Sequence, residues 1–234
     1  MNKTMLPVLC VFAAFNMLAA ESSPKDEVTA AAKKLGQNNY SWKTSVEFGN
    51  FSGETNGKTD KEGLIALSMV FGDNKTEAFL KGDKGAVKTE DQDWQSLAEL
   101  EAAAGNEPGP RTFLLRRLKT FKAPAEEIAG LASKTKELKK EEGTYSGDLT
   151  ESGAKELLAF GGRRGANAPE PKNAKGSVKF WLKDGMLSKY ELHLQGTVNF
   201  GGEDRDIDRT SKFEIKDAGT TKIEVPEAAK KKLG

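Results

Sequence analysis

Apolar and polar residues alternate along several short segments of the chain, which is the pattern of a β-strand with one buried face. Residues 40–48 (YSWKTSVEF) follow this pattern, and residues 178–194 repeat it on both sides of Asp184-Gly185. An Asp-Gly pair between two alternating segments is a strong signal of a β-hairpin. Residues 64–71 (LIALSMVF) are apolar on both faces, which predicts a central strand covered on both sides. The pattern as a whole predicts an antiparallel sheet.

The middle of the chain changes from alternation to helical spacing. Between about residues 93 and 160, apolar residues recur every three or four positions, with a break at Pro108 and Pro110. We therefore expect a helical insertion between two runs of strands. A shorter helix is expected after Ser23, because serine is a good N-cap and Pro24 suits the first helical position.

Residues 161–175 (GGRRGANAPEPKNAK) interrupt the pattern again. Glycine, proline and polar residues without periodicity are typical of a flexible loop. A boundary between two domains is the alternative, but each half would then hold a thin, poorly covered sheet. We expect an α+β fold in which residues 21–234 form one domain. Its core would be a single curved antiparallel sheet, an incomplete β-barrel, covered by helices.

Residues 1–20 combine Lys3, an apolar run and small residues before Glu21, which is typical of a secretory signal peptide cleaved near Ala20. The apolar run is shorter than the ~20 residues that a membrane-spanning helix requires. An uncleaved N-terminal anchor is the alternative. No small residue directly precedes Cys10, so a lipobox is missing. We expect an exported protein in the periplasm or outside the cell.

Composition and charge narrow the classes of function. The chain has 36 Lys and Arg against 35 Asp and Glu, and this balance gives no reason to expect nucleic acid as a partner. Cleavage of the signal peptide would remove the only cysteine, and with it any disulfide. The single histidine, His193, lies on the polar side of its predicted strand. A zinc site of the usual composition needs more such ligands, so we expect no metal and no cofactor.

The acidic residues form no recognisable catalytic or metal-binding motif. Asp204, Asp206 and Asp208 alternate in EDRDIDR, but an EF-hand would need glycine where Arg209 stands. Alternating carboxylates instead predict an exposed strand that guards an edge of the sheet. A hydrolase using paired carboxylates is the least favoured hypothesis, because charged residues are 30% of the chain and such pairs carry little information. We predict a non-enzymatic protein without catalytic residues.

One segment, residues 111–122, is both basic and amphipathic. It contains five cations and no acid, and its apolar residues can share one helical face: Phe113, Leu114, Leu118 and Phe121. Such a helix can lie on an anionic membrane surface or at the mouth of an apolar cavity. The alternative is a short core helix whose arginines extend to solvent.

The C-terminal part of the chain resembles a known family. FWLKDGMLSKYELHLQG, followed by FEIKDAGTTKIEVPEAAKKKL (213–233), resembles the C-terminal half of the periplasmic lipoprotein-carrier superfamily (LolA-like). It also resembles related lipid-binding lipoproteins of mycobacteria (LppX/LprG-like) and an uncharacterised group of exported bacterial proteins. The shared features are an Asp-Gly turn, a later Asp217–Gly219 turn that leads into a strand, and Val225-Pro226 at its end. The resemblance implies an incomplete β-barrel wrapped over helices, with an apolar cavity for acyl chains.

Turn-and-strand patterns carry fold more than function, and no residue matches a functional position of the family. The first hypothesis is a soluble, exported carrier of a lipid or of the acyl chain of a lipidated protein, with possible peripheral contact with an anionic membrane. The second is an envelope interaction or structural protein in which side chains fill the core. The sequence leaves the oligomeric state open.

Candidate lining residues are apolar side chains that a curved sheet and its helical cover would direct into one cavity: Trp42, Leu67, Met69, Phe113, Leu118, Trp181 and Tyr190. Arg116 and Arg117 are expected near a polar headgroup. Because Trp181 and Tyr190 have opposite phases in their strands, only one of them should point to the concave side.

Overall fold

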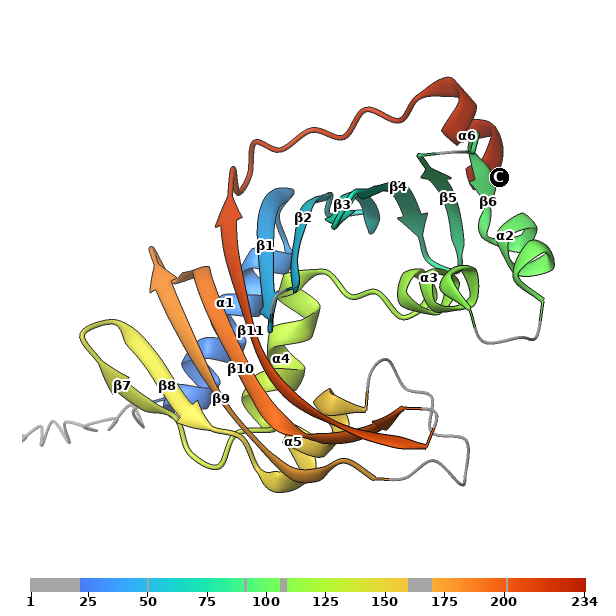
Figure 1. The fold of residues 1–234 in the computed structure, drawn as a ribbon. Helices are drawn as coiled ribbons and strands as arrows, with labels where there is room; N and C mark the ends of the chain where they lie inside the picture. Colours follow the sequence, from blue (N-terminus) through green and yellow to red (C-terminus); the bar gives the residue numbers. More distant parts are fainter. Residues whose placement is uncertain (1–21, 50, 91, 106–108, 160–169, 201) are drawn as a thin grey trace, which may run out of the picture.

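The computed structural model describes residues 22–49, 51–90, 92–105, 109–159, 170–200 and 202–234 (Figure 1). The predicted signal peptide and residues 161–169 of the predicted loop lie outside the described residues. A strand begins at Lys172, so the predicted loop extends too far toward its C-terminal end.

One antiparallel sheet of 11 strands runs through the whole molecule, in the order β6-β5-β4-β3-β2-β1-β11-β10-β9-β8-β7. The order is linear and the sheet is not closed into a barrel. The strands are β1 (Tyr40–Phe48), β2 (Phe51–Thr59), β3 (Leu64–Phe71), β4 (Asn74–Lys81), β5 (Lys84–Thr89), β6 (Gln95–Ser96), β7 (Lys139–Glu141), β8 (Thr144–Asp148), β9 (Lys172–Lys183), β10 (Met186–Phe200) and β11 (Glu203–Lys216). The predicted α+β fold with a single antiparallel sheet is confirmed.

The first and last strands of the chain pair in the middle of the sheet. Thr44 of β1 lies opposite Phe213 of β11, and the pairing extends from Ser41 to Phe48. Strands β2 to β6 continue outward from β1, and β10 to β7 continue outward from β11. The strands before and after the helical insertion therefore belong to one sheet.

The predicted hairpin at Asp184-Gly185 is confirmed. Lys183 pairs with Met186, which leaves a two-residue turn between β9 and β10. Both turn residues have positive φ, 53° for Asp184 and 69° for Gly185. Positive φ at both positions is the geometry of a type I′ turn, which matches the right-handed twist of the two strands.

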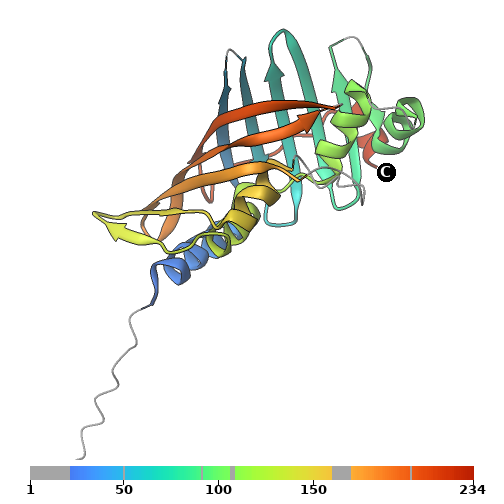
Figure 2. The same ribbon diagram turned by 60° about the horizontal axis from the view of Figure 1, so that its bottom comes forward.

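Six helices are described: α1 (Pro24–Gly36), α2 (Leu97–Ala104), α3 (Pro110–Lys119), α4 (Pro124–Ser133), α5 (Glu151–Leu158) and α6 (Glu227–Leu233). Helices α1 to α5 each bury residues in the main hydrophobic cluster, on the side toward which the sheet curves (Figures 1 and 2). We call this side the concave face. Helix α1 starts where predicted, with a capping box between Ser23 and Asp26.

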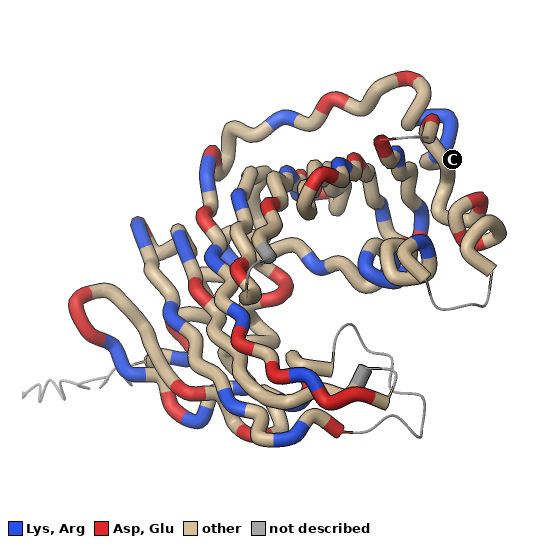
Figure 3. Tube along the Cα trace, viewed as in Figure 1, with Lys and Arg blue, Asp and Glu red and all other residues tan. Residues whose placement is uncertain are grey.

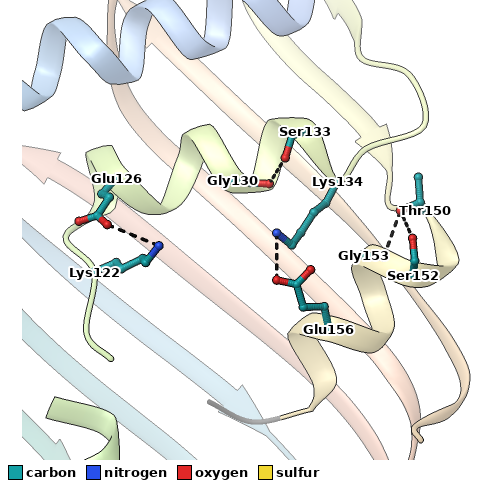
Figure 4. A network of polar contacts seen from close by, with 9 residues as sticks. All are labelled: Lys122, Glu126, Gly130, Ser133, Lys134, Thr150, Ser152, Gly153 and Glu156. Carbon is teal, nitrogen blue, oxygen red and sulfur yellow. Dashed lines mark hydrogen bonds and ion pairs between the residues drawn. The ribbon is translucent and has the colours of Figure 1, made fainter. Parts of the chain in front are cut away.

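Helices α4 and α5 are held together by polar contacts (Figure 4). Lys134, at the end of α4, places its Nζ 3.2 Å from Oε1 of Glu156 in α5. Thr150 caps α5, because its Oγ1 accepts a hydrogen bond from the Gly153 N–H at 3.0 Å.

The region between residues 93 and 160, predicted as a helical insertion, is only partly helical, because it also contains β6, β7 and β8.

The opposite, convex face is covered over β4 to β6 by the C-terminal segment. Residues 220–225 form no strand, contrary to the pattern that the resemblance implies. They cross the sheet as an extended segment, anchored where Asn39 Nδ2 donates to the Thr221 carbonyl at 3.2 Å. Helix α6 then buries Ala229 in a second cluster with Phe79 and Ala86. We call residues 217–234 the C-terminal strap.

The strap explains why β3 is apolar on both faces. Leu67 and Met69 of β3 belong to the main cluster, whereas Ala66 packs against the second cluster under the strap. The double cover does not extend along the whole strand, because Val70 is 41% exposed.

Candidate ligand-binding surface on the concave face

Five of the seven predicted lining residues are packed in the core. They are between 0% and 4% exposed: Trp42, Leu67, Met69, Leu118 and Tyr190. Side chains buried to this degree border no space that water could enter. The structure brings them together on the concave face, as expected, but as parts of the hydrophobic core and not as walls of an open cavity.

Trp181 lies on the other face of the sheet from Tyr190. Its ring has the Lys189 Nζ 4.4 Å and the Lys179 Nζ 5.3 Å from the ring centroid. Tyr190 points into the main cluster and stacks on Phe213, with ring centroids 4.0 Å apart. Strand alternation separates the two residues, so Tyr190 is the one on the concave side and Trp181 belongs to the outer surface.

Most of the predicted apolar face of helix α3 is buried, since Leu118 belongs to the main cluster and Leu114 and Phe121 pack against it. Phe113 is the exception: it is 54% exposed, and Leu115 is buried instead. Phe113 therefore does not line the concave side. Its exposure beside the basic residues Arg111 and Arg116 leaves contact with an anionic membrane as a prediction.

The side chains of Arg116 and Arg117, the two residues predicted near a headgroup, have different environments. Arg117 turns toward the sheet, with its guanidinium carbon 4.3 Å above the centre of the Phe71 ring. Arg116 is partly exposed on the same helix, and nothing in the described contacts joins its side chain to the concave face. Arg117 thus lies at an apolar residue of the concave face, and a role of either arginine at a headgroup stays a prediction.

Two glycines of β2 form the floor of the concave face. The indole ring of Trp42 occupies the space that a Cβ at Gly57 would need, and the Phe71 ring does the same at Gly53. The neighbouring strands thus lay their aromatic rings flat across β2. This arrangement follows from the register, which places Gly57 opposite Trp42 and Gly53 opposite Phe71.

Part of the concave face is apolar and still reached by solvent. Val46 and Phe48 at the end of β1, and Phe71 at the end of β3, are each half-buried. The register places Gly53 between Val46 and Phe71, so these side chains lie on neighbouring strands of the same face. We call Val46, Phe48 and Phe71 the concave apolar patch.

Two arginines lie at this patch, one on each side. Arg117 covers Phe71, and Arg209 of β11 lies directly opposite Phe48 in the register. Burial lowers the pKa of both guanidinium groups, and the positive charge of Arg209 lowers the pKa of Arg117 further. Their charges therefore act on each other across the patch. Arg209 is not among the residues predicted from the sequence, because a basic residue on an alternating strand resembles a solvent-facing one.

A glutamate balances part of this charge. Glu127 of α4 accepts a hydrogen bond from the Tyr190 hydroxyl, with 2.8 Å between the two oxygens. Burial raises the pKa of the Glu127 carboxyl, although Tyr190 and the charge of Arg209 act in the opposite direction. Tyr40 lies on the same side, where its hydroxyl accepts a hydrogen bond from the Ala125 N–H and burial raises its pKa to about 12.

The acidic stretch of β11 faces away from this patch. Asp208 accepts hydrogen bonds from Gln195 Nε2 and lies 2.7 Å from Nε2 of His193, while Asp206 accepts from the Thr197 hydroxyl. These carboxylates lie where β11 extends beyond the last residue of β1, at the acidic end visible in Figure 3. They bond across to β10 on the exposed surface. These carboxylates lie beyond the last residue of β1, in agreement with the predicted exposed strand at an edge of the sheet. Their side chains lie on the outer face of the sheet.

Among the described residues, no group of three or more His, Cys, Asp or Glu could hold a metal ion. None of the helices within the described ranges is long and apolar enough to cross a membrane.

Comparisons with known proteins give little support for a family. No protein-family model and no curated protein matches the chain. Among solved structures, a chain from the complex of Pseudomonas aeruginosa MucA and MucB is similar to it at a TM-score of 0.25 and 12% identity. The match covers 82% of this chain and 93% of that one. A likeness this weak carries no argument, and the resemblance to the lipoprotein-carrier superfamily is not confirmed.

Proposed function

We propose that the protein is an exported, non-enzymatic binder or carrier of a hydrophobic ligand, such as a lipid or the acyl chain of a lipidated protein. One observation supports this function: the concave apolar patch stays partly open to solvent on the inner side of a curved sheet. A chain lying across Val46, Phe48 and Phe71 would be stabilised by about 0.8 kcal/mol for each methylene removed from water. The ligand site is thus proposed at the end of β1 and β3, and not at the packed residues Trp42, Leu67 and Met69.

A second function has an observation of its own. The nearly complete burial of Trp42, Leu67, Met69, Leu118 and Tyr190 favours a scaffold whose core is filled by its own side chains. Such a protein would act in the envelope through its surface, by binding another protein. The two proposals differ in whether the concave face takes up a small hydrophobic molecule.

The deciding experiment measures binding of a fluorescent long-chain fatty acid, together with native mass spectrometry of gently purified protein. We expect co-purified lipid and saturable binding, and we expect Phe48→Ser to weaken the binding several-fold by removing one wall of the patch. Phe113→Ser is the matched control, because Phe113 is a largely exposed phenylalanine that is not one of the three patch residues. Circular dichroism should show that both variants are folded.

Two results would overturn the ligand proposal in favour of the scaffold. One is the absence of both co-purified lipid and saturable probe binding in the wild-type protein. The other is an equal loss of binding in Phe48→Ser and Phe113→Ser, because the probe would then bind without using the concave face.

A further inference from the structure

The arrangement of charge around the concave apolar patch bears on which ligands it would accept. Val46 and Phe48 lie between two cations on neighbouring elements, since Arg209 is opposite Phe48 on β11 and Arg117 reaches down from α3. Both arginines are half-buried and face the same side of the sheet as the patch. An apolar surface flanked by two cations is suited to a molecule with an apolar chain and an anionic end.

The position of Arg117 follows from the contacts beneath it. The Phe71 ring lies flat over Gly53, which has no side chain to lift it. The guanidinium carbon of Arg117 lies 4.3 Å from the centre of that ring, a cation–π contact that a planar guanidinium makes well. Leu115 and Leu118 hold α3 in the core on either side of Arg117 along the helix, so its position is set by packing as well as by charge.

Arg209 is positioned by the sheet. It lies between Phe48 of β1 and Leu194 of β10 in the register, two residues from the buried Ser211. Residues two apart on a strand point to the same face, so Arg209 shares the concave face with Ser211 and Phe213. Each of the two arginines is therefore anchored on a different element, and the patch lies between them.

Glu127 is an acid whose charge acts on Arg209, and one of its oxygens already accepts the Tyr190 hydroxyl. Burial raises the pKa of this carboxyl, so burial weakens the negative charge that Glu127 places near Arg209. Guanidinium groups bind carboxylate and phosphate oxygens through pairs of parallel N–H donors, and these charge-assisted bonds are stronger in partly desolvated surroundings.

We infer that Arg117 and Arg209 select an amphiphile with an anionic head, a carboxylate or a phosphate, whose apolar chain lies on Val46, Phe48 and Phe71. This inference rests on the proposed function and names the class of ligand for the same site. The headgroup is held by the two arginines, and chain methylenes supply the hydrophobic part of the affinity.

The test compares three probes with the same chain length: laurate, lauryl alcohol and laurylamine, each titrated at neutral pH. We expect laurate to bind about tenfold more tightly than lauryl alcohol, a ratio that one charge-assisted hydrogen bond is enough to produce. Laurylamine should bind most weakly. Arg117→Gln and Arg209→Gln should each reduce the ratio of the laurate affinity to the lauryl alcohol affinity several-fold.

Three further variants control for folding and for general charge. Arg116→Gln removes the adjacent, partly exposed cation of the same helix and should keep the full preference for laurate. Arg117→Lys and Arg209→Lys keep the charge but lose the paired donors, so they should keep part of the preference. Circular dichroism reports whether these variants are folded.

The results separate this inference from the function on which it rests. Failure of all three probes to bind overturns the proposed function itself. Equal binding of laurate and lauryl alcohol overturns only the role of the arginines. An equal effect of Arg116→Gln also overturns it, since general charge would then be the cause. Displacement of laurate by inorganic phosphate or acetate at equal concentration would show a site for free anions and would overturn the assignment to an amphiphile.

Discussion

Two glycine residues decide how closely aromatic rings can approach the floor of the concave face. Gly53 and Gly57 are two of the four residues between Gly53 and Thr59 that face this side, and each lies beneath a ring from a neighbouring strand. Glycine normally weakens a strand, but here the missing side chain is filled by a cross-strand aromatic ring. The position of the Phe71 ring, and with it that of Arg117, therefore depends on the missing side chain at Gly53.

Substitution of Gly57 by alanine tests that account. An added Cβ would overlap the indole ring of Trp42, which is itself buried, so the ring or the strand must move. We expect Gly57→Ala to lower the free energy of unfolding by about 1–3 kcal/mol, the usual cost of overpacking. Urea denaturation is the measurement.

Gly130→Ala is the matched control for that change. Gly130 lies within α4, and only the flexible end of Lys134 comes within 4 Å of a Cβ placed there. Because alanine is the better helix former, Gly130→Ala should stabilise the protein by about 0.5–1 kcal/mol. Unchanged or increased stability of Gly57→Ala would contradict the packing described for Trp42.

Glu127 should impose a pH dependence of its own on stability. Burial raises its pKa above the ordinary carboxyl value of 4.5, so the folded state binds more protons than the unfolded state between these two pKa values. The free energy of unfolding therefore decreases as the pH rises through that window. Glu127→Gln cannot ionise, and it should gain stability relative to the wild type as the pH rises from about 4.5 toward neutrality.

Urea unfolding at a series of pH values checks this prediction, with Glu126→Gln as the control for loss of one carboxylate from the same helix. Exposed acids such as Glu99 contribute in the opposite direction and at lower pH, because hydrogen bonds to Lys232 and Ser96 lower the Glu99 pKa to about 2. A stability difference between wild type and Glu127→Gln that stays constant with pH would mean that Glu127 is not buried as described.

At the scale of secondary-structure elements, the C-terminal strap is held to the sheet through the small second cluster. Its helix α6 has seven residues and buries one of them, Ala229, while Ile223 and Val225 pack partly against Phe79 and its neighbours. The strap covers the convex face of the strands whose other face carries the core. We therefore expect the stability of β4 and β5 to depend on the strap, although Ala86 and Ala229 are more than 100 residues apart along the chain.

Ala229→Asp should detach the strap. A carboxylate in this cluster would lose its hydration without an ion partner, so the helix is expected to leave the sheet instead of burying the charge. We expect the free energy of unfolding to fall by about 1–3 kcal/mol, with faster hydrogen exchange at the β4 and β5 amides. Ala228→Asp places the same charge on the exposed neighbour and should have little effect. Equal effects of the two variants would exclude docking of Ala229 as the cause.

At the scale of the whole molecule, the central feature is the pairing of β1 with β11. It joins the beginning of the folded chain to its end and places Phe48 beside Arg209, which are separated by most of the sequence. The curvature of the sheet then gathers α1 to α5 on one side (Figure 2). The candidate surface exists only through this pairing, because no local segment contains more than a part of it.

Local pattern was informative where the environment depends on neighbouring residues. Trp42, Leu67 and Met69 lie together in the main cluster as their strand patterns indicate, and the Asp184-Gly185 hairpin follows from turn chemistry. Alternation placed Trp181 and Tyr190 on opposite faces, and the structure decided that Tyr190 points inward. The prediction of lining residues failed for Phe113 and Trp181, because an aromatic residue at an alternating or helical position can face either side. Arg209 was not predicted, because a basic residue on an alternating strand resembles a solvent-facing one.

The sequence by itself determined the antiparallel strands, the hairpin, the start of α1 and the α+β class, because each depends on side-chain periodicity or on turn and cap residues that are close in the chain. Only the tertiary structure decided which strands meet in the centre, that Phe113 of α3 is exposed, and that the C-terminal strap crosses the convex face. It also decided that the inner aromatic residues are packed while Val46, Phe48 and Phe71 stay partly open. These outcomes depend on long-range register and on competition for volume in the core, which no local pattern encodes.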